Sequence, residues 1–107
     1  MNLDKFEKII NEAFEIKEKI KANTDKLIVD EIKETIQLTD QGKIRVAEKK
    51  NGTWEVNQWV KKAILLSFKI NKMEILRGPY TSWYDKVPGK SVNWKEEDWK
   101  KAGYRHV

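Results

Sequence analysis

The hydrophobic period of the chain changes near residue 43, and this change constrains the fold more than any other feature. Before it, apolar residues recur every three or four positions, which predicts amphipathic helices at about Leu3–Lys21 and Asp25–Thr39. After it, apolar and polar residues alternate in two short segments, 43–49 and 53–56, on either side of Asn51-Gly52. Both residues of an Asn-Gly pair tolerate positive φ, so the two segments are expected to form a β-hairpin.

The helical period returns after this hairpin. Asn57 is a candidate N-cap for a helix at about Gln58–Ile70, which has so few polar positions that it should be the most buried element. Gly42 is expected to cap the end of the preceding helix. The first three helices and the hairpin thus follow from spacing and cap residues alone.

The segment after residue 72 is less regular. Met73–Leu76 is predicted to be a short strand, and 80–90 is predicted to be a loop because aromatic and turn residues dominate it. Asn93-Trp94-Lys95-Glu96 has the form of a capping box, which predicts a last helix ending near Ala102 with Gly103 as its cap. The expected fold class is therefore α+β, a small helical domain of about four helices with one β-hairpin, in one domain over residues 1–107.

The residues that the chain lacks exclude several kinds of chemistry. It has no cysteine, so disulfides, thiolate nucleophiles and Cys-ligated zinc are excluded. Its one histidine, His106, cannot complete a Ser-His-Asp set or anchor a typical zinc site. No apolar run approaches the roughly 20 residues of a membrane span, and the first residues do not resemble a signal peptide. The expected location is therefore the cytoplasm, with no membrane partner.

The net charge of +5 makes an anionic partner such as nucleic acid one alternative. The lysines, however, are spread among glutamates, and arginine occurs only at Arg45, Arg77 and Arg105. A nucleic-acid-binding domain more often clusters its basic residues in one stripe and uses arginine. No nucleic-acid partner is therefore expected, and salt-dependent DNA binding is the property that would reveal one.

Few side chains suggest catalysis by themselves. Asp85, in the aromatic loop, is the candidate catalytic carboxylate, but the stronger interpretation is that it caps a turn before Pro88. The Ser67 hydroxyl is expected to bond back to its helix backbone rather than to attack a substrate. Trp83 and Tyr84 are the best candidates for an exposed aromatic surface. Trp54 and Trp59 are expected to pack in the core or an interface.

Five blocks of the chain together resemble one known family, in the same order and spacing. They are Ile44–Lys49, Asn51–Trp54, Asn57–Phe68, Tyr84–Pro88 and Gly103–Val107. The family pattern reads R-V-A-E-K, a turn with Gly and Trp, Q-W-x-K-K-A-x-L-L-S-F, then Y/F-D-K-V-P and G-F/Y-R-V-V. This chain resembles the N-terminal domain of tetrahydrodipicolinate N-succinyltransferases. It departs from the pattern at Gly89, where a bulky residue is usual, and at His106, which replaces a valine.

The resemblance implies an acyltransferase that moves succinyl from succinyl-CoA to ring-opened tetrahydrodipicolinate, a dicarboxylate, in the diaminopimelate route to lysine. It implies a homotrimer whose catalytic part is a left-handed β-helix of hexapeptide repeats. No metal is implied, and succinyl-CoA is a co-substrate, so no cofactor is expected on this chain itself. In the family the repeats begin directly after the G-F/Y-R block. The family's β-helix is therefore expected to be absent here, and the chain is expected to be inactive alone.

One substrate-binding residue of the family falls within the chain. The arginine of G-F/Y-R binds a substrate carboxylate and maps onto Arg105, and a guanidinium fork matches a carboxylate bidentately. No catalytic, cofactor-binding or metal-binding residue is expected. Two functions stay open: the N-terminal domain or a truncated form of the transferase, and a non-catalytic interaction module that assembles with a separately encoded β-helix.

Overall fold

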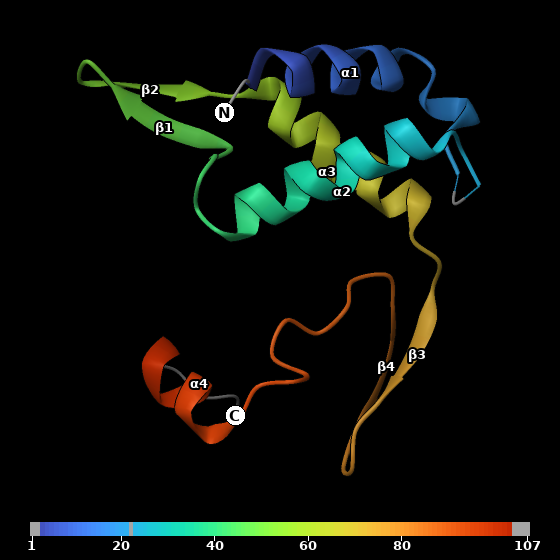
Figure 1. The fold of residues 1–107 in the computed structure, drawn as a ribbon, viewed down its shortest axis with the longest axis vertical. Helices are drawn as coiled ribbons and strands as arrows, with labels where there is room; N and C mark the ends of the chain where they lie inside the picture. The colour runs from blue at the N-terminus through green and yellow to red at the C-terminus, as the bar shows by residue number, and fades with distance from the viewer. Residues whose placement is uncertain (1–2, 22, 104–107) are drawn as a thin grey trace.

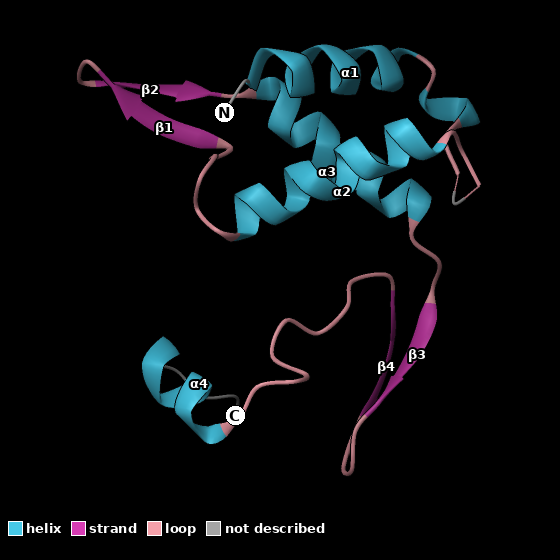
Figure 2. Ribbon diagram, in the orientation of Figure 1, coloured by secondary structure: helices cyan, strands magenta, loops and turns pink. Residues whose placement is uncertain are grey.

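The computed structural model describes residues 3–21 and 23–103, which form helices and two separate β-hairpins (Figures 1 and 2). The elements are α1 (Leu3–Glu15), η1 (Lys17–Lys19), α2 (Lys26–Asp40), β1 (Ala47–Lys50), β2 (Thr53–Val56), α3 (Gln58–Ile70), β3 (Glu74–Arg77), β4 (Ser82–Asp85) and α4 (Glu96–Ala102). The predicted α+β class is confirmed, and so is the number of about four helices.

The core lies between α1, α2 and α3, which pack against one another (Figure 1). The most enclosed side chains come from all three helices and include Ile10, Ile32, Val60 and Leu66. Full burial of one such side chain contributes about 1.5–3 kcal/mol, so this cluster supplies most of the hydrophobic stabilisation. The buried residues of α3 are all apolar and are Trp59, Val60, Ala63, Leu66 and Ile70, which confirms that α3 is the most buried element.

Both ends of α2 are capped. Asp25 precedes the helix, and its Oδ1 accepts a hydrogen bond from the Leu27 N–H at 2.9 Å. At the other end Gly42 has a φ of 75°, and its N–H donates to the Thr39 carbonyl. The Lys43 N–H donates to the Leu38 carbonyl, which completes a Schellman motif and confirms Gly42 as the cap.

The first helix ends earlier than its spacing predicts. α1 stops at Glu15 instead of Lys21, and a 3-10 turn, Lys17–Lys19, follows. Ile20 then has extended backbone and is buried in the core. The tighter turn thus leads the chain inward at Ile20, which supplies an apolar side chain at the position where the helical pattern predicted one.

The first hairpin forms at the predicted turn. β1 pairs antiparallel with β2, and Asn51 and Gly52 have φ values of 51° and 80°, as a type I′ turn requires. β1 begins at Ala47 instead of residue 43, because its partner ends at Val56, where α3 is about to begin. Trp54 does not pack in the core: its side chain is 65% exposed, because the hairpin projects beyond the helices (Figure 1), and its packing in an interface stays a prediction.

A second hairpin occupies part of the segment predicted to be a loop. β3 confirms the predicted strand near 73–76, and β4 pairs with it antiparallel, so the expectation of one β-hairpin was incomplete. The Gly78 N–H donates to the Thr81 carbonyl at 2.7 Å and closes the turn. The sequence of β4 does not alternate, because adjacent Trp83 and Tyr84 lie on opposite faces and both are exposed. Because neither face of β4 is buried, its sequence lacks the alternation of apolar and polar residues that predicts a strand.

The last helix is capped two residues later than predicted. α4 begins at Glu96, and the Lys95 N–H donates to Asp98 Oδ2 at 2.9 Å, so Asp98 replaces Glu96 as the acidic member of the box. The Trp94 N–H instead donates to the Ser91 carbonyl in the preceding turn. Gly103, with a φ of 77°, ends the helix as predicted.

The molecule is more extended than its length requires. We call residues 72–103, which carry the second hairpin and α4, the arm. Neither hairpin strand of the arm nor α4 packs extensively against the three core helices, and the arm descends from the end of α3 (Figure 1). The radius of gyration is 16.2 Å, against about 13 Å for a compact domain of this length. In the described ranges, no helix has the length and apolar character needed to cross a membrane.

Candidate functional site

Arg105, the predicted ligand for a substrate carboxylate, lies outside the described residues. So do Tyr104, His106 and Val107, the residues of that block that accompany it after Gly103. The structure describes the approach to the block: α4 ends at Gly103, whose N–H donates to the Trp99 carbonyl at 3.0 Å. Trp99 meets Trp94 edge-to-face with ring centroids 5.1 Å apart, which ties α4 to the loop before it.

The most connected polar group of the described residues lies where the first hairpin meets α3. Asn57 is the N-cap of α3, but its side chain does not bond to the helix. Its Nδ2 donates to the Arg45 carbonyl at 2.7 Å and to Glu48 Oε1 at 3.1 Å, and its backbone N–H donates to the Val46 carbonyl at 2.7 Å. One residue thus fixes the hairpin to the start of α3.

Glu48 is held ionised at this junction. Hydrogen bonds, first from Asn57 and then from Lys50, lower the pKa of its carboxyl from the ordinary value of 4.5. The Lys50 Nζ lies 3.2 Å from Glu48 Oε1 and 3.8 Å from Glu55 Oε2 across the hairpin. Lys50 and Glu55 thus join the two strands, and the hydrogen bond from Asn57 joins Glu48, the acidic residue of the block R-V-A-E-K, to the start of α3.

A cavity of about 340 Å³ adjoins the junction, between the start of α1 and the 42–45 segment. Its charged lining residues are Asp4, Glu7, Lys43, Arg45, Glu48 and Lys50. Cations and carboxylates are equal in number, so the lining does not favour a ligand of either sign. We assign no ligand to this cavity.

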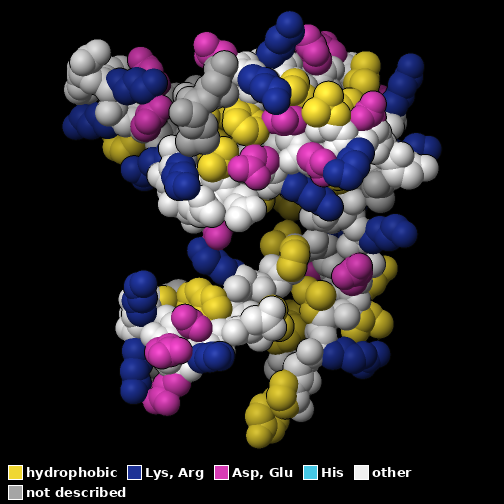
Figure 3. Space-filling view, in the orientation of Figure 1, with side chains coloured by type: hydrophobic (Ala, Val, Ile, Leu, Met, Phe, Trp, Pro, Cys, Tyr) yellow, Lys and Arg dark blue, Asp and Glu magenta, His cyan; other side chains and the backbone are white. Residues whose placement is uncertain are grey.

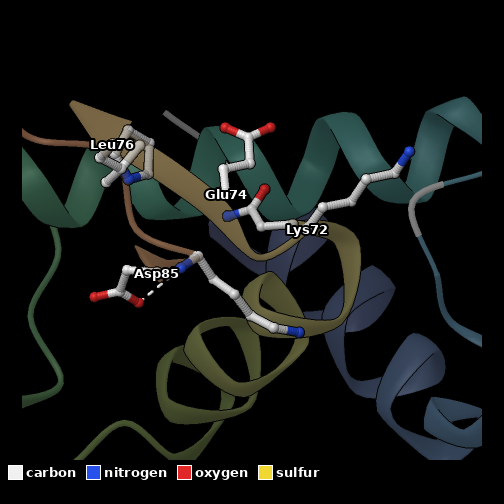
Figure 4. A pocket seen from close by; sticks show the side chains of 7 residues that line it. Lys72, Glu74, Leu76 and Asp85 are labelled. Carbon is white, nitrogen blue, oxygen red and sulfur yellow. Dashed lines mark hydrogen bonds between the residues drawn. The ribbon is translucent and has the colours of Figure 1, made fainter. Parts of the chain in front are cut away.

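A smaller cavity of about 100 Å³ lies at the base of the second hairpin, lined by residues that include Lys72, Glu74, Leu76 and Asp85 (Figure 4). Glu74 and Asp85 are cross-strand partners, but their carboxylates point away from each other. The Lys72 side chain extends in a third direction. Like charges directly opposite in a sheet repel, and the divergence of these groups leaves no carboxylate pair for acid–base catalysis.

The candidate residues of this region have structural roles. Asp85 Oδ1 accepts a hydrogen bond from the Lys86 N–H at 2.6 Å, in the turn that follows β4. The Ser67 hydroxyl donates to the Ile64 carbonyl at 2.6 Å, which confirms that it bonds back to its helix. Trp59 is enclosed and Trp83 and Tyr84 are exposed, as predicted. Within 3–21 and 23–103, no three His, Cys, Asp or Glu side chains gather closely enough to hold a metal ion.

Two lysines join the arm to the helical core. The Lys86 Nζ donates to the Phe68 carbonyl at 2.7 Å, in the last turn of α3, where a cation also complements the helix dipole. The Lys90 Nζ lies 2.7 Å from Asp40 Oδ1 at the end of α2. Lys86 belongs to the Tyr84–Pro88 block, but nothing in the local pattern of either lysine identifies partners 18 and 50 residues away.

Comparison with known proteins shows that the chain is similar to one family along most of its length. Residues 5–70 match the family model described as tetrahydrodipicolinate N-succinyltransferase N-terminal. A 2,3,4,5-tetrahydropyridine-2,6-dicarboxylate N-succinyltransferase of Pelagibacter ubique is 54% identical over 98% of this chain and 39% of its own length. Proteins of the same name from Bartonella tribocorum and Agrobacterium fabrum are 48% and 45% identical over 99% of the chain. The chain spans about two fifths of the length of these relatives.

Proposed function

The chain belongs to the tetrahydrodipicolinate N-succinyltransferase family, by its N-terminal part, and from this membership we propose its function. It serves as the N-terminal domain of an acyltransferase that moves succinyl from succinyl-CoA to ring-opened tetrahydrodipicolinate. The observation that carries the proposal is the sequence match along nearly the whole chain to enzymes bearing that activity in their names. The proposal includes the diaminopimelate route to lysine, the cytoplasm and a homotrimeric enzyme.

The described residues support a scaffold role within this function. Their polar groups are used in caps, in the Asn57 junction and in the two lysine contacts of the arm. The side chains in the cavity at the hairpin base diverge and do not converge on one reacting atom (Figure 4). We therefore propose that the groups which polarise the thioester and accept the amine proton lie in the part of the enzyme that this chain does not match.

Arg105 is the one residue that we assign to the substrate. The proposed substrate carries two carboxylates, and a guanidinium binds a carboxylate strongly when the site is partly desolvated and a second wall holds the ligand. Gly103 ends α4 two residues before Arg105, so the arginine directly follows the last described element. We propose that Arg105 forms one wall of the carboxylate site and that the rest of the enzyme forms the other.

The activity test compares the chain with a chimera in which the unmatched part of the Pelagibacter ubique relative follows Val107. Release of free thiol from succinyl-CoA, with ring-opened substrate present, measures transfer. We expect turnover from the chimera and none above background from the chain alone. Turnover by the purified chain would contradict the division of labour, and a folded chimera without turnover would contradict the proposed function.

The role of Arg105 is tested in the same chimera. Arg105→Lys keeps the charge but removes the two-pronged geometry, so the KM for the dicarboxylate should rise about tenfold while that for succinyl-CoA changes little. Arg45→Lys, at the hairpin junction, is the matched control and should change neither constant. If Arg105→Lys also leaves both constants unchanged, Arg105 does not bind the substrate.

The alternative function is a non-catalytic interaction module that assembles with a separately encoded catalytic polypeptide. The exposed apolar side chains of the arm support this alternative, because such a surface can bind a second polypeptide. Mixing the chain with the unmatched part of the relative, expressed as a second polypeptide, separates the two functions. Restored transfer in the mixture would favour the module, whereas activity only in the covalent chimera would favour the single-chain domain.

A further inference from the structure

The chain exposes more surface than a protein of its mass needs to. Its accessible surface is 8673 Å², whereas a compact monomer of 12.7 kDa exposes about 6,200 Å². The excess is larger than the roughly 800 Å² that each partner contributes to a stable interface of ordinary size. The excess therefore leaves room for a complete interface.

The exposed apolar side chains concentrate on the arm. Thirteen large apolar side chains are exposed among the described residues, and seven of them lie between Met73 and Val92, a segment of about a fifth of the chain. Figure 3 shows hydrophobic side chains along the hairpin part of the arm, while lysines and carboxylates gather around α4 and are scattered among hydrophobic side chains over the core helices. A concentration of this kind marks a surface that another polypeptide covers.

One face of the second hairpin is the centre of this surface. Ile75 and Tyr84 are cross-strand partners and so share a face, and their side chains are 57% and 68% exposed. The opposite face pairs Leu76, which is half-buried and lines the cavity at the hairpin base, with Trp83, which is 57% exposed. Both apolar side chains of the Ile75–Tyr84 face are exposed, whereas the opposite face is partly covered at Leu76.

The hairpin also needs support that the described residues do not supply. A two-stranded sheet is at best marginally stable in water unless a helix or further strands pack on it. Neither β3 nor β4 packs extensively on the described helices, and the contacts of Lys86 with the Phe68 carbonyl and of Lys90 with Asp40, which join the loop beyond β4 to the core, are polar. These contacts direct the hairpin away from the core and leave the Ile75–Tyr84 face accessible.

We propose that the Ile75–Tyr84 face docks on the polypeptide that forms the remainder of a full-length family member. This inference rests on the proposed function. About three fifths of the length of the relatives lies outside the part that this chain matches, so in those proteins a large partner surface is tethered to the aligned hairpin. A tether of that kind holds the partner at millimolar effective concentration, which a second free copy does not reach. The occupant is therefore that remainder and not another copy of this chain.

Hydrogen exchange in the chimera tests the docking independently of activity. Amides of β3 and β4 should exchange about tenfold or more slowly in the chimera than in the chain alone, because docking closes the hairpin against local opening. The double substitution Ile75→Glu and Tyr84→Glu should abolish this slowing without changing exchange in α1, α2 and α3. Leu27→Glu is the matched control, since Leu27 is also 57% exposed but lies on α2, and it should leave the slowing intact.

The outcomes separate the two proposals. Fast hairpin exchange in a chimera with protected core helices would overturn the docking, whether or not the chimera transfers succinyl. Slow exchange without transfer would support the docking and count against the proposed function. If exchange of the β3 and β4 amides in the chain alone slows as its concentration rises, a second copy covers the face, and the inference is overturned. If the chimera does not fold, hydrogen exchange is measured instead on the intact Pelagibacter ubique relative. Rapid exchange of the amides in its aligned hairpin segment would overturn the docking proposal.

Discussion

At the scale of single residues, one buried carboxylate departs from the rule that buried polar groups are paired. Glu31 on α2 is buried, and its Oε2 has no hydrogen-bond partner. Its Oε1 lies 3.8 Å from the Lys5 Nζ of α1, at the limit of an ion pair. A buried charge with one distant partner costs stability that an apolar side chain of similar volume would not cost.

Replacing Glu31 with Met should therefore raise the free energy of unfolding by about 1 kcal/mol, and replacing Lys5 with Met should lower it by about 1 kcal/mol. The opposite signs are expected because the first change removes the buried charge and the second leaves it alone. Glu34→Met, at an exposed position of the same helix, is the control and should have little effect. Urea unfolding of the three variants measures the differences, and equal losses from the Glu31 and Lys5 variants would contradict the interpretation.

The turn of the first hairpin gives a second prediction at this scale. A Cβ on Gly52 would meet no atom within 4 Å, so any cost of substitution comes from its φ of 80° alone. Gly52→Val should destabilise the chain by about 1–2 kcal/mol, because a β-branched residue is strained in that region. Gly52→Asn should cost much less, since Asn51 already adopts a positive φ next to it. Thermal unfolding compares the pair, and equal midpoints would show that the turn does not depend on backbone freedom.

At the scale of elements, the junction between the first hairpin and α3 depends on one carboxylate and one amide. Asn57 donates from its side chain to Glu48 and to the Arg45 carbonyl and from its backbone to the Val46 carbonyl, so three hydrogen bonds of one residue attach the hairpin to the helix. The hairpin has little buried apolar surface of its own, as the exposed β2 residues show. Its attachment should therefore respond to the charge of Glu48.

The junction should weaken in acid. The pKa of Glu48 is lowered in the folded chain, so its stabilising contribution is fully present above the unfolded value of about 4.5 and is lost as the pH falls through the folded pKa. Glu48→Gln should reduce stability near pH 7, and its difference from the wild type should shrink toward about pH 3. Thermal midpoints across this range provide the measurement, with Glu34→Gln as an exposed control. A difference that stays constant with pH would contradict the ionised role of Glu48.

At the scale of the whole molecule, a compact three-helix core carries the projecting first hairpin and the arm (Figure 1). The extended shape and the excess surface have one physical cause, since the arm contributes exposed apolar residues without enclosing them. The core supplies the stability, and the arm supplies the surface for association.

The isolated chain should be a monomer of extended shape. Small-angle scattering at micromolar concentration should give a radius of gyration near 16.2 Å instead of the roughly 13 Å of a compact domain. Light scattering should report a single chain, because the proposed occupant of the arm surface is not a second copy. A stable trimer of the chain alone would show that the N-terminal domain itself contains the main subunit contacts.

The sequence by itself determined the elements whose information is local. Periodic apolar residues specified the three core helices, Asn51-Gly52 specified the first turn, and Asp25, Gly42 and Gly103 specified helix ends, because spacing, positive φ and capping act within a few residues. The family blocks, read in order, identified the family that the comparisons then confirmed. Only Arg105, which lies outside the described residues, keeps its role as a prediction from that family resemblance.

Only the tertiary structure decided the features that depend on distant partners. It paired β4 with β3, turned the Asn57 side chain away from its own helix toward Glu48, and brought Lys86 and Lys90 to the ends of α3 and α2. It also left Trp54 exposed, since an aromatic side chain is buried only where another element is there to cover it. The physical reason is the same for each feature. A hydrogen bond or a contact between distant residues depends on how the elements pack against one another, and a local sequence pattern does not specify that packing.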